Sequence, residues 1–75
     1  MRSYRPDMKT EVYESDPFSG SRGPHLASME TDYRFERNDE LFLTANGRRI
    51  KVRITHVVLE WDGASLRRDL LVMKL

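Results

Sequence analysis

Hydrophobic and polar residues alternate over most of the chain after Tyr33. Residues 40–45, ELFLTA, alternate in this way, and residues 48–61, RRIKVRITHVVLEW, do so over a longer run. A period of two is typical of β-strands, because successive side chains point to opposite faces. No segment has the apolar period of an amphipathic helix. The pattern therefore predicts a mainly β fold.

The dipeptide Asn46-Gly47 separates these two segments. Both residues tolerate positive φ, which the two-residue hairpin turn requires. With this turn, Leu43 faces Ile50, so that apolar side chains meet across the strand pair. Turn chemistry and side-chain matching therefore predict the same register.

A second turn is predicted in residues 61–66, WDGASL, before a third strand at about 66–75. A loop of two residues, Asp62 and Gly63, fits this sequence, and so does a loop of four, 62–65. Both loops contain an even number of residues, so both give the same faces. We therefore expect a three-stranded antiparallel meander.

The expected meander carries apolar residues on both of its faces. The expected core face holds Leu41, Leu43, Ile50, Val52, Ile54, Leu71, Met73 and Leu75. The opposite face holds a second apolar group, which consists of Val57, Leu59, Trp61, Leu66, Leu70 and Val72. A contiguous apolar patch of this kind normally belongs to a contact. We expect a bend of the long strand, the N-terminal segment or another chain to cover it.

Residues 1–32 differ in character from the β domain that we expect at 33–75. Residues 15–28, SDPFSGSRGPHLAS, contain four serines, two glycines and two prolines, which predicts a flexible loop. The alternation in residues 8–13 permits a short edge strand. The expected fold is a small antiparallel sheet or partly open barrel with one or two short N-terminal strands and an otherwise flexible N-terminal segment.

Composition argues against several kinds of chemistry. The 75 residues include no cysteine, which excludes disulfides, thiol nucleophiles and thiolate zinc sites. His25 and His56 lie in no metal-ligand spacing, and no glycine-rich phosphate loop or nucleophile turn is present. We expect no enzyme, no cofactor and no small-molecule substrate. Because no apolar run approaches a membrane span and the N-terminus lacks a secretory signal, we expect a cytoplasmic protein without membrane contact.

The net charge of +1 is unevenly distributed along the chain. Residues 1–32 hold four bases and six acids, a balance of −2, whereas residues 33–75 hold nine and six, a balance of +3. Bases gather near the first turn beside an aromatic residue, in a set that we call the basic stripe: Phe42, Arg48, Arg49, Lys51 and Arg53. Such a set is typical of surfaces that bind phosphates and stack on bases. It also keeps an exposed strand soluble.

Two functions of different classes fit these patterns. The first is a non-enzymatic protein-binding or assembly module, which forms a homodimer or docks on another protein through the second apolar group. The last strand, which ends in LLVMKL, offers a second route as an exposed edge. The alternative is a small module that binds RNA or single-stranded DNA through the basic stripe.

Overall fold

The computed structural model describes residues 8–16 and 18–75. Within these residues the regular structure is entirely β, so the predicted fold class is confirmed. The strands are β1 (Met8–Ser15), β2 (Arg22–Thr31), β3 (Glu40–Ala45), β4 (Arg48–Trp61) and β5 (Leu66–Lys74).

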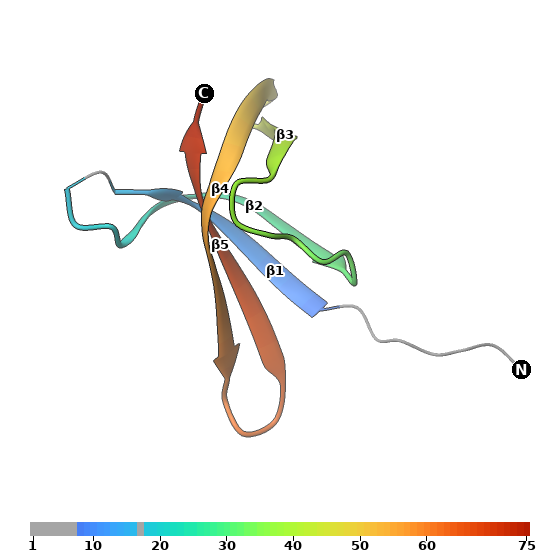
Figure 1. Cartoon of the computed structure of the whole chain (residues 1–75). Helices are drawn as coiled ribbons and strands as arrows, with labels where there is room; N and C mark the ends of the chain where they lie inside the picture. The colour runs from blue at the N-terminus through green and yellow to red at the C-terminus, as the bar shows by residue number, and fades with distance from the viewer. Residues whose placement is uncertain (1–7, 17) are drawn as a thin grey trace, which may run out of the picture.

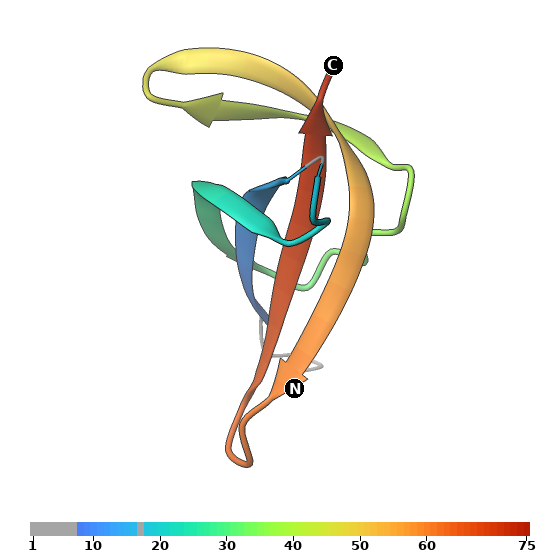
Figure 2. The same cartoon turned by 90° about the vertical axis from the view of Figure 1, so that its left-hand side faces the viewer.

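The five strands form one sheet in the order β2-β1-β5-β4-β3, which curls into a half-barrel (Figures 1 and 2). The pairing of β1 with β5 is parallel, and the other three neighbouring pairs are antiparallel. The sheet is therefore mixed, whereas we expected an antiparallel one. Because β5 is paired on both sides, the expectation that the last strand forms an edge is wrong. The edges are β2 and β3.

The first hairpin turn has the predicted geometry. Asn46 has a φ of 54° and Gly47 a φ of 75°. Leu43 faces Ile50, so the predicted register of β3 and β4 is confirmed. The alternation of the sequence and the chemistry of this turn together determined the pairing.

The second turn is the longer of the two alternatives. Trp61 is paired with Leu66, which leaves the four residues 62–65 in the loop. The two hairpins extend from opposite ends of β4 (Figure 2).

A β-bulge lies in the middle of β4. Ile54 pairs with Val72 and Val57 pairs with Leu70, so β4 advances three residues while β5 advances two. Thr55 Oγ1 donates a hydrogen bond of 3.0 Å to a main-chain carbonyl of β5 at this point. The extra residue shifts the alternation of β4 by one position. Side chains beyond the bulge therefore point to the face opposite the one that strict alternation would give them.

The bulge brings both apolar groups of β4 to the inner face of the half-barrel. The core cluster on this face consists of Val12, Leu43, Val52, Ile54, Leu70 and Val72. We expected Leu70 and Val72 to lie on the opposite face from Ile54, and this is wrong. Leu71 is instead buried on the outer face, and Met73 and Leu75 are exposed rather than in the core.

The N-terminal strands complete the sheet. Val12 in β1 is fully buried between β2 and β5. Residues 22–28 belong to β2, so the expectation of a loop there is wrong. Pro24 has no main-chain N–H to donate, and an edge strand tolerates this. Gly23 permits close approach, since a Cβ at this position would lie 2.6 Å from the main-chain oxygen of Glu14.

The segment that links β2 to β3 covers part of the inner face. Main-chain hydrogen bonds join Asn38 N to Ile54 O and Ile54 N to Asp39 O, both at 2.8 Å. Phe35 packs against the core cluster. The guanidinium of Arg68 lies 4.9 Å from the centre of the Phe35 ring. The core is therefore closed by the linking segment as well as by the curl of the sheet.

Candidate functional site

The β4–β5 hairpin ends in an ordered turn. Asp62 Oδ1 accepts hydrogen bonds from the main-chain N–H groups of Ala64 and Ser65, both at 2.8 Å. The main-chain bond from Ser65, followed by that from Ala64, lowers the pKa of Asp62. Gly63 has a φ of 93°, which residues with a side chain rarely adopt. The turn residues therefore fix the conformation of the hairpin end.

Three apolar side chains are exposed beside this turn. Leu59 is 59% exposed, Trp61 65% and Leu66 39%. Alternation from Val57 in β4 and from Leu70 in β5 places all three on the inner face, in line with the core. We call these three residues the tip patch. The hairpin that carries them projects from the rest of the sheet (Figure 1).

A cleft of about 640 Å³ lies at the end of the hairpin, mostly on the outer face of the sheet, and reaches the tip patch only at Trp61 and Leu66. Trp61 and Leu66 form its apolar lining. The rest of the lining is polar or charged: Lys9, Glu30, Glu60, Asp62, Ser65 and Arg67. Two bases and three acids nearly cancel, so the cleft offers an apolar contact without a strong electrostatic field.

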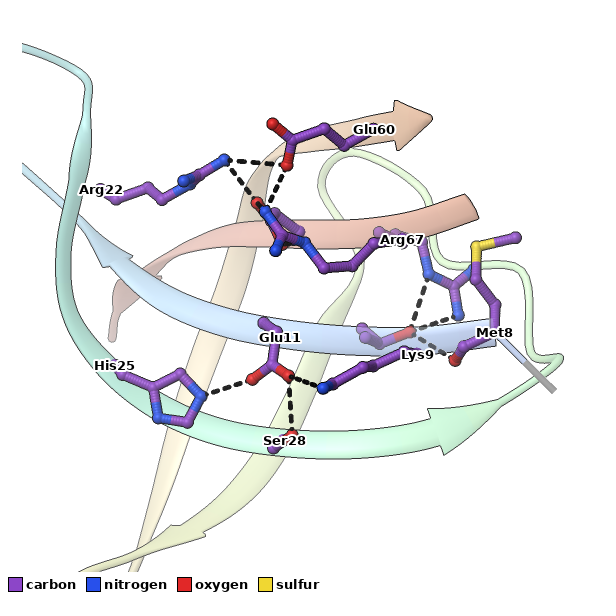
Figure 3. Close-up of polar contacts among 11 residues, drawn as sticks. Met8, Lys9, Glu11, Arg22, His25, Ser28, Glu60 and Arg67 are labelled. Atoms are coloured by element: carbon purple, nitrogen blue, oxygen red, sulfur yellow. Dashed lines mark hydrogen bonds and ion pairs between the residues drawn. The ribbon is translucent and has the colours of Figure 1, made fainter. Parts of the chain in front are cut away.

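Four charged side chains hold the hairpin against β2 on the outer face (Figure 3). Arg22 Nη2 lies 2.6 Å from Asp69 Oδ2 and 3.6 Å from Glu60 Oε1. Arg67 Nε lies 3.2 Å from Asp69 Oδ1, and Arg67 also contacts Glu60. The Asp69 side chain is 1% exposed, so its charge depends on the two arginines for compensation. Asp69 in turn raises the pKa of Arg67.

Most of the basic stripe lies on the outer face of the β3–β4 hairpin. Glu40 lies 2.8 Å from Arg53 and 3.1 Å from Lys51, and hydrogen bonds from these two bases lower the pKa of Glu40. The guanidinium of Arg49 lies 4.0 Å from the centre of the Phe42 ring, which is 54% exposed. Intramolecular contacts therefore occupy three of the bases.

Arg48 differs from the other members of the stripe. It pairs with Ala45 at the end of the hairpin, so alternation places it on the opposite face from Arg49. Neither Arg48 nor Arg49 forms an ion pair with a carboxylate in residues 8–16 and 18–75. The structure thus brings Phe42 together with Arg49, Lys51 and Arg53, and separates Arg48 from them.

The predicted interface is divided by the bulge. Leu59, Trp61 and Leu66 are exposed and adjacent. Leu70 and Val72 are fully buried in the core cluster, so a surface role for these two residues is wrong. Val57 is half-buried and packs against the same cluster. The exposed part of the predicted interface is therefore the tip patch.

The two histidines have different surroundings. His25 Nε2 in β2 lies 2.7 Å from Glu11 Oε1 in β1, a contact visible in Figure 3. That hydrogen bond is the largest influence on the pKa of Glu11, which is lowered. His56 is exposed, with Nδ1 at 3.2 Å from Thr55 Oγ1. Among the described residues, no group of three or more His, Cys, Asp or Glu side chains is placed to hold a metal ion.

No pattern in the sequence indicated the cluster of Arg22, Arg67, Asp69 and Glu60. Arg22 lies in a segment that we expected to be a loop, and Asp69 lies near the other end of the chain. The parallel pairing of β1 with β5 brings them together, and no local sequence pattern predicted that pairing.

No family model, curated protein or solved structure matches this chain. In the part of the chain that the structure describes, no helix is long and apolar enough to cross a membrane.

Proposed function

We propose that the protein is a non-enzymatic protein-binding or assembly module whose contact surface is the tip patch. The observation that carries the proposal is the 65% exposure of Trp61 between Leu59 and Leu66 on an ordered hairpin. Tryptophan is enriched among the residues that dominate protein–protein binding energy. Exposed apolar side chains that adjoin one another, rather than being scattered singly, are typical of contact sites.

The rigidity of the hairpin supports this proposal. The hydrogen bonds of the Asp62 turn and the ion pairs of Asp69 restrain the hairpin in the absence of a partner. A preorganised surface loses less conformational entropy on binding than a mobile loop does. The tip patch therefore needs little rearrangement to receive a partner.

The cleft shares only Trp61 and Leu66 with the tip patch, and its charges favour a partner with an apolar surface over a strongly charged one. The bases Lys9 and Arg67 are accompanied by the acids Glu30, Glu60 and Asp62. A polyanion or a polycation would meet like charges in this lining. A folded protein surface with an apolar centre and a rim of mixed polar residues matches the lining of the cleft better.

Site-specific photo-crosslinking in cells that express the protein tests the proposal. A photoreactive amino acid at position 59 leaves Trp61 in place, and the same amino acid at position 18 is the control. Phe18 is 98% exposed and lies in the loop between β1 and β2. We expect protein adducts from position 59 and none from position 18. Equal yields from the two positions, or none from either, would contradict a contact at the tip patch.

A second candidate function is the binding of RNA or single-stranded DNA by the basic stripe. The observation in its favour is that Arg49 lies on the exposed ring of Phe42 and forms no ion pair with a carboxylate in residues 8–16 and 18–75. Against it, Glu40 already neutralises part of the charge of Lys51 and Arg53. Titration with a single-stranded oligonucleotide tests it, because binding through phosphates weakens steeply with added salt. Absence of binding at about 50 mM salt would remove this candidate.

A further inference from the structure

We infer that the protein partner of the tip patch contributes a carboxylate, which binds the guanidinium of Arg68 beside the patch. This inference rests on the proposed function, because it assigns a chemical group to the partner of the same surface. Three features of Arg68 support it: its position on the inner face, its burial without an acid and the part of its guanidinium that stays free.

Arg68 lies on the inner face of the sheet, directly beside the tip patch. It pairs with Leu59 across β4 and β5. Along β5 it stands between Leu66 of the patch and Leu70 of the core cluster, two residues from each. Alternation therefore places these side chains on one face. A partner that covers the tip patch and continues along β5 meets Arg68 next.

Neutral groups hold the guanidinium of Arg68 over β1. Nε and Nη2 donate hydrogen bonds of 3.1 and 2.9 Å to Thr10 Oγ1. Nη2 donates another, of 3.3 Å, to the main-chain oxygen of Thr31. The centre of the Phe35 ring lies 4.9 Å from the guanidinium carbon. These contacts fix the orientation of the guanidinium but bring no negative charge to it.

The charge of Arg68 is buried without an acid in the described part of the chain. Only 6% of the residue is exposed, yet it forms no ion pair with a carboxylate in residues 8–16 and 18–75. Its neighbour Arg67 differs, because it lies on the outer face and pairs with Asp69. Burial lowers the pKa of Arg68, since it removes water from the charged form. Buried charges in proteins are normally paired, so Arg68 calls for an anion.

One nitrogen of the guanidinium is available to such an anion. Nη1 donates no hydrogen bond to an atom of residues 8–16 and 18–75, and it is not among the enclosed atoms there that lack a partner. It therefore keeps contact with solvent. A planar carboxylate matches the guanidinium in shape and charge. A phosphate dianion fits less well, because its second charge would need another base and the adjoining tip patch is apolar. We expect an Asp or Glu side chain, or a C-terminus, next to apolar residues of the partner.

Titration of the 75-residue chain with phenylacetate, followed by NMR, tests the inference. This probe joins one carboxylate to an apolar ring, and phenylacetamide is its neutral control. We expect phenylacetate to shift the Nε–H signal of Arg68 and the indole N–H signal of Trp61, which is the only tryptophan. A probe of this size should bind with a dissociation constant in the millimolar range. The amide should bind about tenfold more weakly, because it lacks the charge. Inorganic phosphate should shift the Arg68 signal less than phenylacetate does at equal concentration.

Matched variants locate the bound carboxylate. Arg68→Gln should remove the preference for phenylacetate over phenylacetamide. Arg49→Gln is the control, because Arg49 is exposed on the other hairpin and also forms no ion pair with a carboxylate in the described residues. We expect it to keep the preference of the wild type. Circular dichroism verifies folding. If Arg68→Gln does not fold, the comparison of acid and amide at the Nε–H signal of wild-type Arg68 still decides.

The outcomes separate this inference from the proposed function. Equal binding of acid and amide, or a stronger response of Arg68 to inorganic phosphate, overturns the inference. So does an Arg68 signal that ignores phenylacetate but moves in Asp7→Asn, since the anion would then belong to the chain itself; Asp7 lies outside the described residues. If position 59 nevertheless gives specific photo-crosslinks, the tip patch remains a contact surface and only the acidic partner is removed. Absence of those crosslinks overturns the proposed function, and the inference with it, whatever the probe does.

Discussion

The two ends of β4 present the same kind of face to different surroundings. Val52 and Ile54, near the β3 end, are fully buried, whereas Leu59 and Trp61, near the β5 turn, are 59% and 65% exposed. All four side chains lie on the inner face of one continuous strand. The chemistry of the side chains does not explain the difference, because both ends are apolar.

The difference arises from what lies opposite each end. The β3 end faces β1, β2 and the segment that carries Phe35. The other end extends past these elements, and its attachment to β2 is ionic, through Arg22 and Asp69 on the outer face. Whether an apolar side chain is buried therefore depends on which distant segments of the chain pack against it. Apolar character in the sequence identifies only the face of the strand that such segments would bury.

Truncation of matched aliphatic residues at the two ends of β4 should have the largest effect on stability. Ile54→Ala creates a cavity in the buried core and should lower the free energy of unfolding by about 2–4 kcal/mol. Leu59→Ala removes an exposed side chain and should change it by less than about 0.5 kcal/mol in the monomer. Urea denaturation at a low protein concentration measures both. Similar losses for the two variants would show that the tip patch is internal core.

Local patterns in the sequence predicted the three-stranded meander but not the segments that pack over its inner face. The alternation of β4 and the Asn46-Gly47 turn determined the first hairpin, and the long β4 and the later turn were placed within a residue or two. β2 was mistaken for a loop, because Pro24 and the nearby serines and glycines match the composition of loops. At the edge of a sheet these residues are compatible with a strand.

The bulge was the main obstacle to predicting the site. The apolar positions of β4 change from even numbers, ending at Ile54, to odd numbers, beginning at Val57. We interpreted this change as two apolar faces, although one extra residue at Thr55 also produces it. The change of phase was therefore a local signal of the bulge. The pairing of Arg22 with Asp69 had no such signal, because it depends on the parallel contact between β1 and β5.

Loss of the carboxylate of Asp69 should have an intermediate effect, because it weakens the attachment of the exposed hairpin end. Asp69→Ala leaves Arg22 and Arg67 without their buried partner. Both arginines can turn toward water, so we expect a loss of about 1–3 kcal/mol rather than the full cost of an isolated buried charge. Hydrogen exchange should also become faster in the β4–β5 hairpin than at Val52.

Glu60→Gln is the matched control for this substitution. Its side chain is 51% exposed and contacts the same two arginines. An exposed ion pair contributes less than about 1 kcal/mol. If Asp69→Ala and Glu60→Gln have equal effects, burial of Asp69 does not govern the attachment.

The smallest expected effect concerns Glu11, which attaches the covering strand β2 to β1. Its carboxylate accepts hydrogen bonds from His25 and Ser28 of β2, and the bond with His25 is the main cause of its lowered pKa. A carboxyl group whose pKa is lower in the folded state stabilises the fold fully above its unfolded pKa. That stabilisation is lost as the pH falls through the pKa of the folded state.

Glu11→Gln lacks this titration and should be less stable than the wild type by no more than about 1 kcal/mol near pH 6. The difference should shrink progressively below the ordinary glutamate pKa of 4.5. Denaturation of both proteins at a series of pH values measures this difference in stability. A difference that stays constant or grows in acid would mean that the bonds of Glu11 do not help to hold β2 over the buried end of the sheet.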